Sequence, residues 1–184
     1  MAVNQMLWLW AVLIAVVAGW LDWRSRRIPN WLTVSGFALG LLTSAAMSGW
    51  QGARSGLLGA GFALGVLLPL VWLRALGAGD WKLMGALGAA LGPGQVFLVL
   101  LGSVVIAGLM AVFQVTWQKR WRVTLRNLVE LLKGLVVFGL RPHPQITLDN
   151  PRMPALPFGV AAAGATTLGW LLIGFWPLVR QVAG

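Results

Sequence analysis

Long runs of apolar residues are the feature that most constrains what this chain can fold into. A helix needs roughly 20 apolar residues to cross the ~30 Å hydrocarbon core of a bilayer. Five runs approach or exceed that length, at 7–21, 31–47, 57–76, 95–117 and 155–178, and a shorter one covers 81–91. The sequence therefore predicts an all-α polytopic membrane protein with about six transmembrane helices.

The composition supports this fold class. Hydrophobic residues make up 59% of the 184 residues, charged residues only 10%, and the mean hydropathy is +0.82. A soluble domain is about half apolar and a quarter charged. We expect a single membrane-embedded domain over 1–184. No Lys or Arg precedes Arg24, so the first apolar run lacks the charged start of a secretory signal, and we expect this helix to be retained.

The basic residues predict the orientation of the helices. If the first helix runs inward and 81–91 counts as a helix, only Arg54 and Arg180 of the 14 basic residues fall outside, which is a strong positive-inside pattern. Both termini then face outward. A net charge of +10 would suggest nucleic acid as the partner of a soluble protein. Here it indicates orientation and contact with anionic lipid, so no nucleic-acid partner is expected.

The segment 118–153 is the one substantial polar region. Apolar residues recur at helical spacing in its first half, opposite a charged face, which predicts an amphipathic helix on the cytoplasmic membrane surface. These apolar residues are Trp121, Leu125, Leu128, Leu132 and Leu135. Proline and turn-forming residues dominate 139–154, which predicts a loop.

The shortest apolar run, 81–91, would extend only about 17 Å as a helix, less than the bilayer core. Gly85, Gly88, Ala89 and Gly92 give it small-residue faces that allow neighbouring helices to approach closely. We expect a short helix enclosed by other helices rather than by lipid.

Missing residue types exclude several chemistries. The chain has no cysteine and one histidine, His143. Disulfides, thiol catalysis and cysteine zinc sites are excluded, and a Ser-His-Asp triad or a histidine metal site is not expected. The sequence therefore predicts neither a metal nor another cofactor.

Of the four acidic residues, Glu130 falls on the charged face of the predicted surface helix and Asp149 in a turn sequence. Asp22 and Asp80 instead lie at the cytoplasmic ends of apolar spans, where an ionisable group is costly and usually functional. Two carboxyl groups held close in a partly dry site share a proton and titrate as a pair. The ionised member can activate a water while the protonated member polarises a peptide carbonyl, which is the chemistry of aspartic proteases.

Two glycines precede the second aspartate in the sequence Gly77-Ala78-Gly79-Asp80. Without Cβ atoms they can adopt unusual φ/ψ and let a substrate strand pass close to the carboxylate. The alternative is an ordinary turn in which Asp80 caps the following helix.

Three ordered motifs resemble those of the type IV prepilin peptidases, membrane aspartic proteases of the GxGD class. The first is Asp22 with Arg24 and the sequence RRIPN at 26–30. The second is GAGD at 77–80, followed by WKL. The third is LPFGVAAAG at 156–164, similar to a proline-glycine segment that these enzymes place near the catalytic pair. The resemblance extends over nearly the whole chain.

This resemblance implies an enzyme that cleaves the basic leader peptide of prepilins or pseudopilins at the cytoplasmic face of the bacterial inner membrane. It also implies that Asp22 and Asp80 form the catalytic pair. Larger members carry a cytoplasmic insertion with paired cysteines and methylate the new N-terminus. This chain has no cysteine and only nine residues at 22–30 between its first two spans. It is similar to the short members associated with Flp/Tad-type pili, which implies cleavage without N-methylation.

Several further residues are candidates for supporting roles. Lys82 can stabilise an ionised Asp80, hold it in place, or simply extend to the interface. Arg24 fits a topology determinant, as do Arg26 and Arg27, and the alternative is that one of the three pairs with an aspartate. Asn30 is predicted to cap a helix. Pro157 and Gly159 can leave a backbone group free for an extended substrate, or can simply begin a helix. These residues complete the candidate site.

Two other functions remain open from the sequence. One is a cation or proton transporter that uses both carboxylates, although such proteins place them near the bilayer midplane, often within repeated halves, and no internal repeat is seen here. The other is a scaffold that binds pilin subunits without cutting them. The presence of both aspartates favours the peptidase.

Overall fold

The computed structural model describes residues 2–119, 121–122, 124–126, 129 and 157–175. Its elements are the helices α1 (Ala2–Ser25), α2 (Asn30–Trp72), α3 (Ala78–Trp117) and α5 (Phe158–Gly169), and the π-helical turn η1 (Trp170–Phe175). No strand occurs within these ranges, so this part of the fold is all-α, as the sequence predicts. Three of the helices, α1, α2 and α3, are long and apolar enough to cross a membrane.

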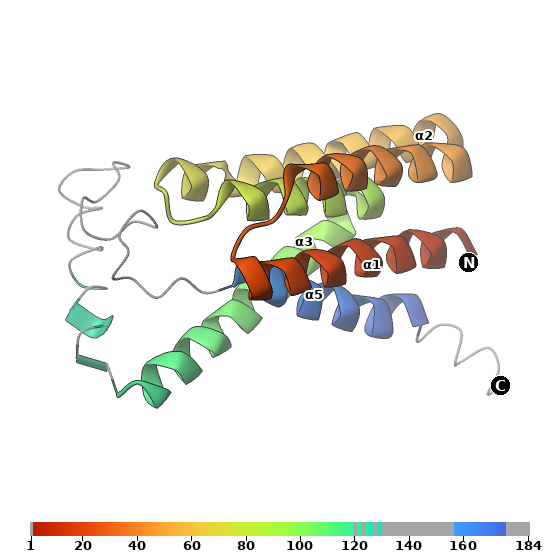
Figure 1. Ribbon diagram of the computed structural model, residues 1–184. Helices are drawn as coiled ribbons and strands as arrows, with labels where there is room; N and C mark the ends of the chain where they lie inside the picture. The colour runs from red at the N-terminus through yellow and green to blue at the C-terminus, as the bar shows by residue number, and fades with distance from the viewer. Residues whose placement is uncertain (1, 120, 123, 127–128, 130–156, 176–184) are drawn as a thin grey trace.

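Helix α2 folds back on itself at Gly49. Its 43 residues would extend about 65 Å as one straight helix, twice the thickness of a bilayer core. Gly49 instead has φ 59° and ψ −143°, a conformation that favours glycine. The hydroxyl of Ser44 donates a hydrogen bond to the carbonyl of Gly52 at 3.0 Å across the bend. Residues 30–48 and 50–72 therefore form two arms of a helical hairpin, visible in Figure 1.

Helix α3 has a second fold of the same kind at Gly92. This residue has φ 77° and ψ 174°, and Pro93 follows it, where its fixed φ suits the first turn of a new helix. Residues 78–91 form the first arm and residues 93–117 the second. Figure 1 shows the second arm running back past α5 and away from α2.

The first arm of α3 is the centre of the molecule. All ten residues from Leu83 to Gly92 are buried, and α2 shares its largest interface with α3. At Gly88 the two backbones are in contact, and a Cβ at this position would collide with Gly59 of the second arm of α2. The expectation that 81–91 is a helix enclosed by other helices is confirmed, and the small residues are what permits this close contact.

Basic residues terminate the three long helices at one end of the molecule. Arg26, Arg74 and Lys119 follow α1, α2 and α3 within two residues, each in the left-handed region with φ between 51° and 55°. A positive charge at a helix C-terminus complements the helix dipole. Figure 1 shows that α1, α2 and α3 end, and α5 begins, at the end of the molecule opposite the N-terminus. We call this the basic end.

The predicted break between the runs 31–47 and 57–76 contains the bend at Gly49, but the second of these helices ends at Trp72 rather than at 76. The last helix begins at Phe158 rather than 155 and changes to π-helix at Trp170. Residues 121–122, 124–126 and 129 are helical, in line with the predicted surface helix. The rest of 118–153, with Glu130, His143 and Asp149, lies outside the described residues.

Candidate active site

Asp22 belongs to the buried face of α1. Buried residues recur along this helix at spacings of three and four, which places them in one stripe. The stripe consists of Trp8, Ala11, Ala15, Ala18 and Asp22, all fully buried except Asp22, which is 7% exposed. The carboxyl group therefore continues the core-facing stripe rather than pointing outward from the end of the helix.

Helix α5 supplies a hydrogen bond to this carboxyl group. The amide N–H of Gly159 donates to Oδ2 of Asp22 at 2.9 Å. A Cβ on Gly159 would lie 2.9 Å from Cβ of Asp22 and 3.0 Å from its Oδ2, too close for any side chain to fit without movement. Close packing between Gly19, three residues before Asp22, and Ala163 holds the two helices in this contact.

Two alternatives were open for Gly159, an amide free to pair with a substrate or a simple helix start. Its amide is bound to Asp22 in the first turn of α5, which contradicts the first alternative and fits the second. Pro157, the other residue predicted from this segment, is the N-cap of α5 with φ −74° and ψ 90°. Its carbonyl accepts a hydrogen bond from the amide of Val160 at 3.2 Å.

Asp80 lies in the first turn of α3 and is half-buried. Its Oδ2 folds back over Gly77, where a Cβ would lie 3.0 Å away. Its Oδ1 is buried and has no hydrogen-bond partner among the described residues. Neither glycine of the GAGD sequence has a positive φ, and Gly77 is ordinary extended backbone with φ −69° and ψ 143°. The expected unusual backbone is therefore absent from both glycines, and Gly77 instead leaves room for the carboxyl group.

The two carboxyl groups are brought together by the start of α3. Gly79 packs against Ile28, in the connection that follows α1, with Cβ of Ile28 3.2 Å from where a Cβ of Gly79 would lie. Asp22 and Asp80 are close enough to interact electrostatically. They are also the only acidic residues in the described ranges, where no group of three potential metal ligands occurs.

Lys82 forms a link between the starts of two helices. Its ammonium donates to Oδ1 of Asn30 at 2.9 Å. The N-cap of α2 is Pro29, without a side-chain cap bond, so the prediction of Asn30 as the cap was wrong. Instead, the side-chain oxygen of Asn30 binds the ammonium group of Lys82, two residues after Asp80.

The two arginines near the end of α1 differ in their surroundings. Arg24 is exposed in the last turn of α1. Arg26 is close enough to Asp22 for its charge to attract the carboxylate, and its backbone N–H donates to the Asp22 carbonyl at 2.8 Å. The sequence indicated Arg26 as one of three arginines that could pair with an aspartate, but it did not identify Gly19 as part of the site. The spacing of Gly19 from Asp22, three residues along one helical face, is the signal for the glycine.

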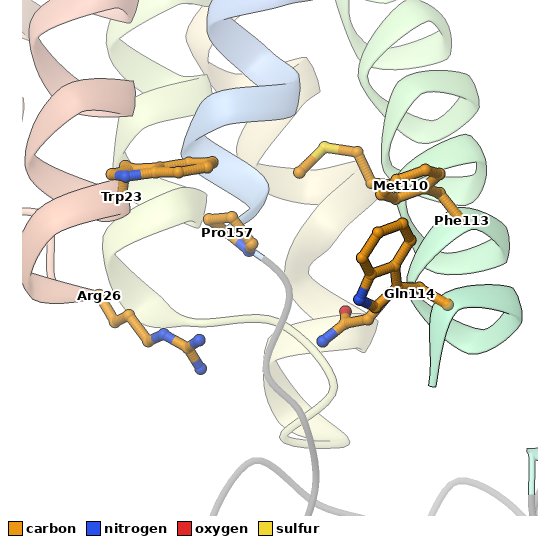
Figure 2. Close-up of a pocket in the computed structure, with 7 residues that line it drawn as sticks. Trp23, Arg26, Met110, Phe113, Gln114 and Pro157 are labelled. Atoms are coloured by element: carbon orange, nitrogen blue, oxygen red, sulfur yellow. The ribbon is translucent and has the colours of Figure 1, made fainter. Parts of the chain in front are cut away.

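A pocket of about 360 Å³ opens beside Asp22 at the basic end. It lies between the end of α1, the second arm of α3 and the first residue before α5 (Figure 2). Trp23 and Pro157 face Met110 and Phe113 across the pocket, with Arg26 near its mouth. The complete lining is Trp23, Arg26, Met110, Phe113, Gln114, Trp117 and Pro157. The pocket is therefore mainly apolar and aromatic, and both Trp23 and Pro157 are within two residues of the Asp22–Gly159 contact.

Comparison with known proteins identifies one family. The sequence profile of the type IV leader peptidase family matches residues 8–112, more than half of the chain. The match includes Asp22, Asp80, the whole of α2 and α3 as far as residue 112. No curated protein and no solved structure matches the chain significantly.

Proposed function

Because this chain belongs to the type IV leader peptidase family, we propose that it is an aspartic endopeptidase that removes the leader peptide of prepilins or pseudopilins. Family membership makes it a membrane protease that acts on prepilins in general. The observation that carries the finer proposal is the pair of carboxyl groups, Asp22 and Asp80, brought together from α1 and α3. They are the catalytic pair of this proposal.

The chemistry follows from the environment of the pair. One carboxylate accepts a proton from a water molecule, and the other carboxylic acid donates a hydrogen bond to the carbonyl oxygen of the scissile peptide. Asp22 is buried against α5, and Oδ1 of Asp80 is buried although the residue as a whole is only half-buried. Lys82 and Asn30 then fix the start of α3, and with it Asp80.

The folds at Gly49 and Gly92 support six membrane spans. Each arm of α2 and α3 is then one span, together with α1 and the helix that begins at Phe158. The basic end faces the cytoplasm, because basic residues collect on that side of membrane proteins. We place the enzyme in the bacterial inner membrane, with the carboxyl pair at the cytoplasmic surface and the basic residues against anionic lipid.

The substrate is a peptide with a basic leader, cut without methylation of the new N-terminus. Two features support the short, cleavage-only form: the absence of cysteine and the brief connection of residues 26–29 between α1 and α2. The positions of the carboxyl groups disfavour the transporter alternative. Asp22 is three residues from the end of α1 and Asp80 is the third residue of α3, whereas transport sites lie near the midplane.

The experiment that tests this function is co-expression with candidate prepilins from the same genome. Wild-type protein should shorten at least one precursor on a gel. D22N and D80N should each lower the cleavage rate by about 10²–10⁴-fold, the range over which acid–base groups act. E130Q, which removes a carboxylate from the predicted surface helix, should cleave at the wild-type rate.

Folded wild-type protein that leaves every precursor uncut would contradict the peptidase proposal. Ion flux in vesicles would then be measured, since the transporter also depends on both carboxylates. Cleavage that persists in both Asn variants would place the chemistry elsewhere in the chain.

A further inference from the structure

The two carboxyl groups differ in the hydrogen bonds available to them. Oδ2 of Asp22 accepts a hydrogen bond from a backbone amide, a group that can donate but never accept. Oδ1 of Asp80 is buried and has no partner in the part of the chain that the structure describes. The two carboxyl groups that share one proton therefore have different hydrogen-bond partners, and this difference gives each of them a different role.

Three contacts favour the ionised form of Asp22. The amide of Gly159 donates to it at 2.9 Å, and a hydrogen bond to an ionised acceptor is about twice as strong as a neutral one. This amide lies in the first turn of α5, so the positive end of the α5 dipole also points at the carboxylate. Arg26 adds an attractive charge.

Burial disfavours the ionised form of both carboxyl groups. The effect that opposes a charge on Asp22 rather than on Asp80 is the dipole of α3. Asp80 lies in the first turn of that helix, where an anion is favoured, whereas Asp22 is near the C-terminus of α1, where it is disfavoured. At Asp22 the dipole of α5 opposes that of α1. Of the two carboxyl groups, only that of Asp22 also accepts a hydrogen bond from a backbone N–H in the described ranges. An ionised Asp80 would leave one charged oxygen buried without a donor.

We propose that Asp22 is the general base of the pair, that Asp80 is the general acid, and that the backbone amide of Gly159 is the positioning group that sets this division. The proposal rests on the peptidase function above. It assigns a separate step of the reaction to each carboxyl group.

The proton transfers balance in this assignment. Asp22 takes a proton from water as the water oxygen bonds to the scissile carbonyl carbon, and Asp80 gives its proton to the carbonyl oxygen, which produces a neutral gem-diol. Asp22 then returns its proton to the peptide nitrogen as the C–N bond breaks. Asp80 recovers a proton from a diol hydroxyl as the carboxylic acid product forms, and both side chains end in their starting states.

The first test compares D22N with D80N by single-turnover cleavage of a purified prepilin in detergent. An Asn amide can donate to the carbonyl oxygen as an acid does, but it cannot accept a proton. D80N should therefore lose about 10²-fold in rate and D22N about 10⁴-fold. D80N should also lose the alkaline limb of the wild-type pH profile, because Asn does not deprotonate there. Equal losses, or a greater loss in D80N, would overturn the assignment.

The second test uses G159A, whose methyl group would displace Asp22 from the amide. Loss of the donor makes Asp22 harder to ionise, so the acid limb should move to higher pH while the alkaline limb stays in place. Among the described residues, the charged groups facing Asp22 are Arg26 and Asp80, and α5 contributes no titratable side chain. If Gly159 had only a structural role, G159A would lower the cleavage rate without moving the acid limb of the pH profile relative to the alkaline limb. A shift of the alkaline limb alone would overturn the proposal.

The control is G164A on the same helix, where a Cβ would meet only the flexible end of Ile106. Its pH profile should match the wild type. If G159A does not fold, the two Asn variants decide the assignment alone. Failure of the wild type to cleave any precursor would contradict the peptidase function itself, so the two failures are distinguishable.

Discussion

Glycines hold both carboxyl groups in place. Asp22 accepts a hydrogen bond from the backbone of Gly159, and Asp80 folds over the bare Cα of Gly77. In each case a side chain on the glycine would occupy the space that the carboxyl group now fills. The glycines of the GAGD sequence are therefore important here because they lack a Cβ atom, not because they adopt an unusual backbone conformation.

Substitution of Gly77 should test this role. The methyl group of G77A would lie 3.0 Å from Oδ2 of Asp80, so the carboxyl group must shift by a few tenths of an ångström. A displacement of about 1 Å in an active site can lower the rate by about 10²-fold, and for this smaller shift we expect a loss of about 10-fold or less. The measurement is the cleavage rate of a purified prepilin. G61A, where a Cβ meets nothing within 4 Å, should cleave at the wild-type rate. Equal rates in both variants would contradict this role.

At the scale of the elements, glycines also determine how closely the helices approach. Gly59 of α2 and Gly88 of α3 meet backbone to backbone at the centre of the molecule. This crossing supports the first arm of α3, whose N-terminal turn carries Asp80. The stability of the bundle and the position of Asp80 therefore depend on the same contact.

A larger residue at this crossing should destabilise the fold. G88V would place a branched side chain against the Gly59 backbone, and overpacking of this kind costs roughly 1–3 kcal/mol. The midpoint of thermal unfolding in detergent should fall by roughly 5–10 °C. G65V introduces the same side chain into open space on α2 and should leave the midpoint nearly unchanged. If both variants unfold at the wild-type temperature, the crossing is not important for stability.

The sequence predicted both which helices pack closely and where the chain folds back. Small residues around Gly88 have a clear meaning in an apolar helix. Gly49 and Gly92, which bend the chain, fall in the breaks between predicted apolar runs, SGWQGARSG at 48–56 and GPG at 92–94. Gly61 and Gly65 lie inside the apolar run 57–76 and are in regular helix.

The sequence predicted Asp22 and Asp80 as candidate site residues, but it did not predict the contacts that surround them. Asp22 and Asp80 stand out because carboxylates are rare in apolar helices. The contact of Lys82 with Asn30 joins residues 52 positions apart, and that of Gly159 with Asp22 joins residues 137 apart. Neither local pattern nor charge spacing predicts such pairings, because they depend on how whole helices are placed.

At the scale of the whole molecule, the charges divide between two ends. The helix ends with Arg26, Arg74 and Lys119 lie together, and α5 begins among them. Arg54, by contrast, follows the fold at Gly49 by five residues, at the opposite end. A membrane placed between the two ends would leave the carboxyl pair near one surface.

The absence of native cysteine makes this orientation easy to test. Single cysteines in R24C and R54C should be labelled from opposite sides by a maleimide that does not cross membranes. Both positions are exposed, so both should react in detergent. We expect R54C to be labelled in intact cells and R24C only in inverted vesicles. The reverse pattern would invert the proposed topology, and labelling of both from one side would contradict a membrane between the two ends.

The contact between Asp22 and α5 has a consequence for stability as well as for chemistry. The first amides of a helix have no partner within that helix, and a nearby acceptor that satisfies one is worth about 0.5–2 kcal/mol. Asp22 is such an acceptor for α5, supplied from a distant part of the sequence. The same side chain thus caps one helix and belongs to the carboxyl pair that we propose as catalytic. D22N retains an oxygen that can accept the hydrogen bond from Gly159, whereas D22A does not. D22N therefore removes the proton acceptor and keeps the helix cap, whereas D22A removes both.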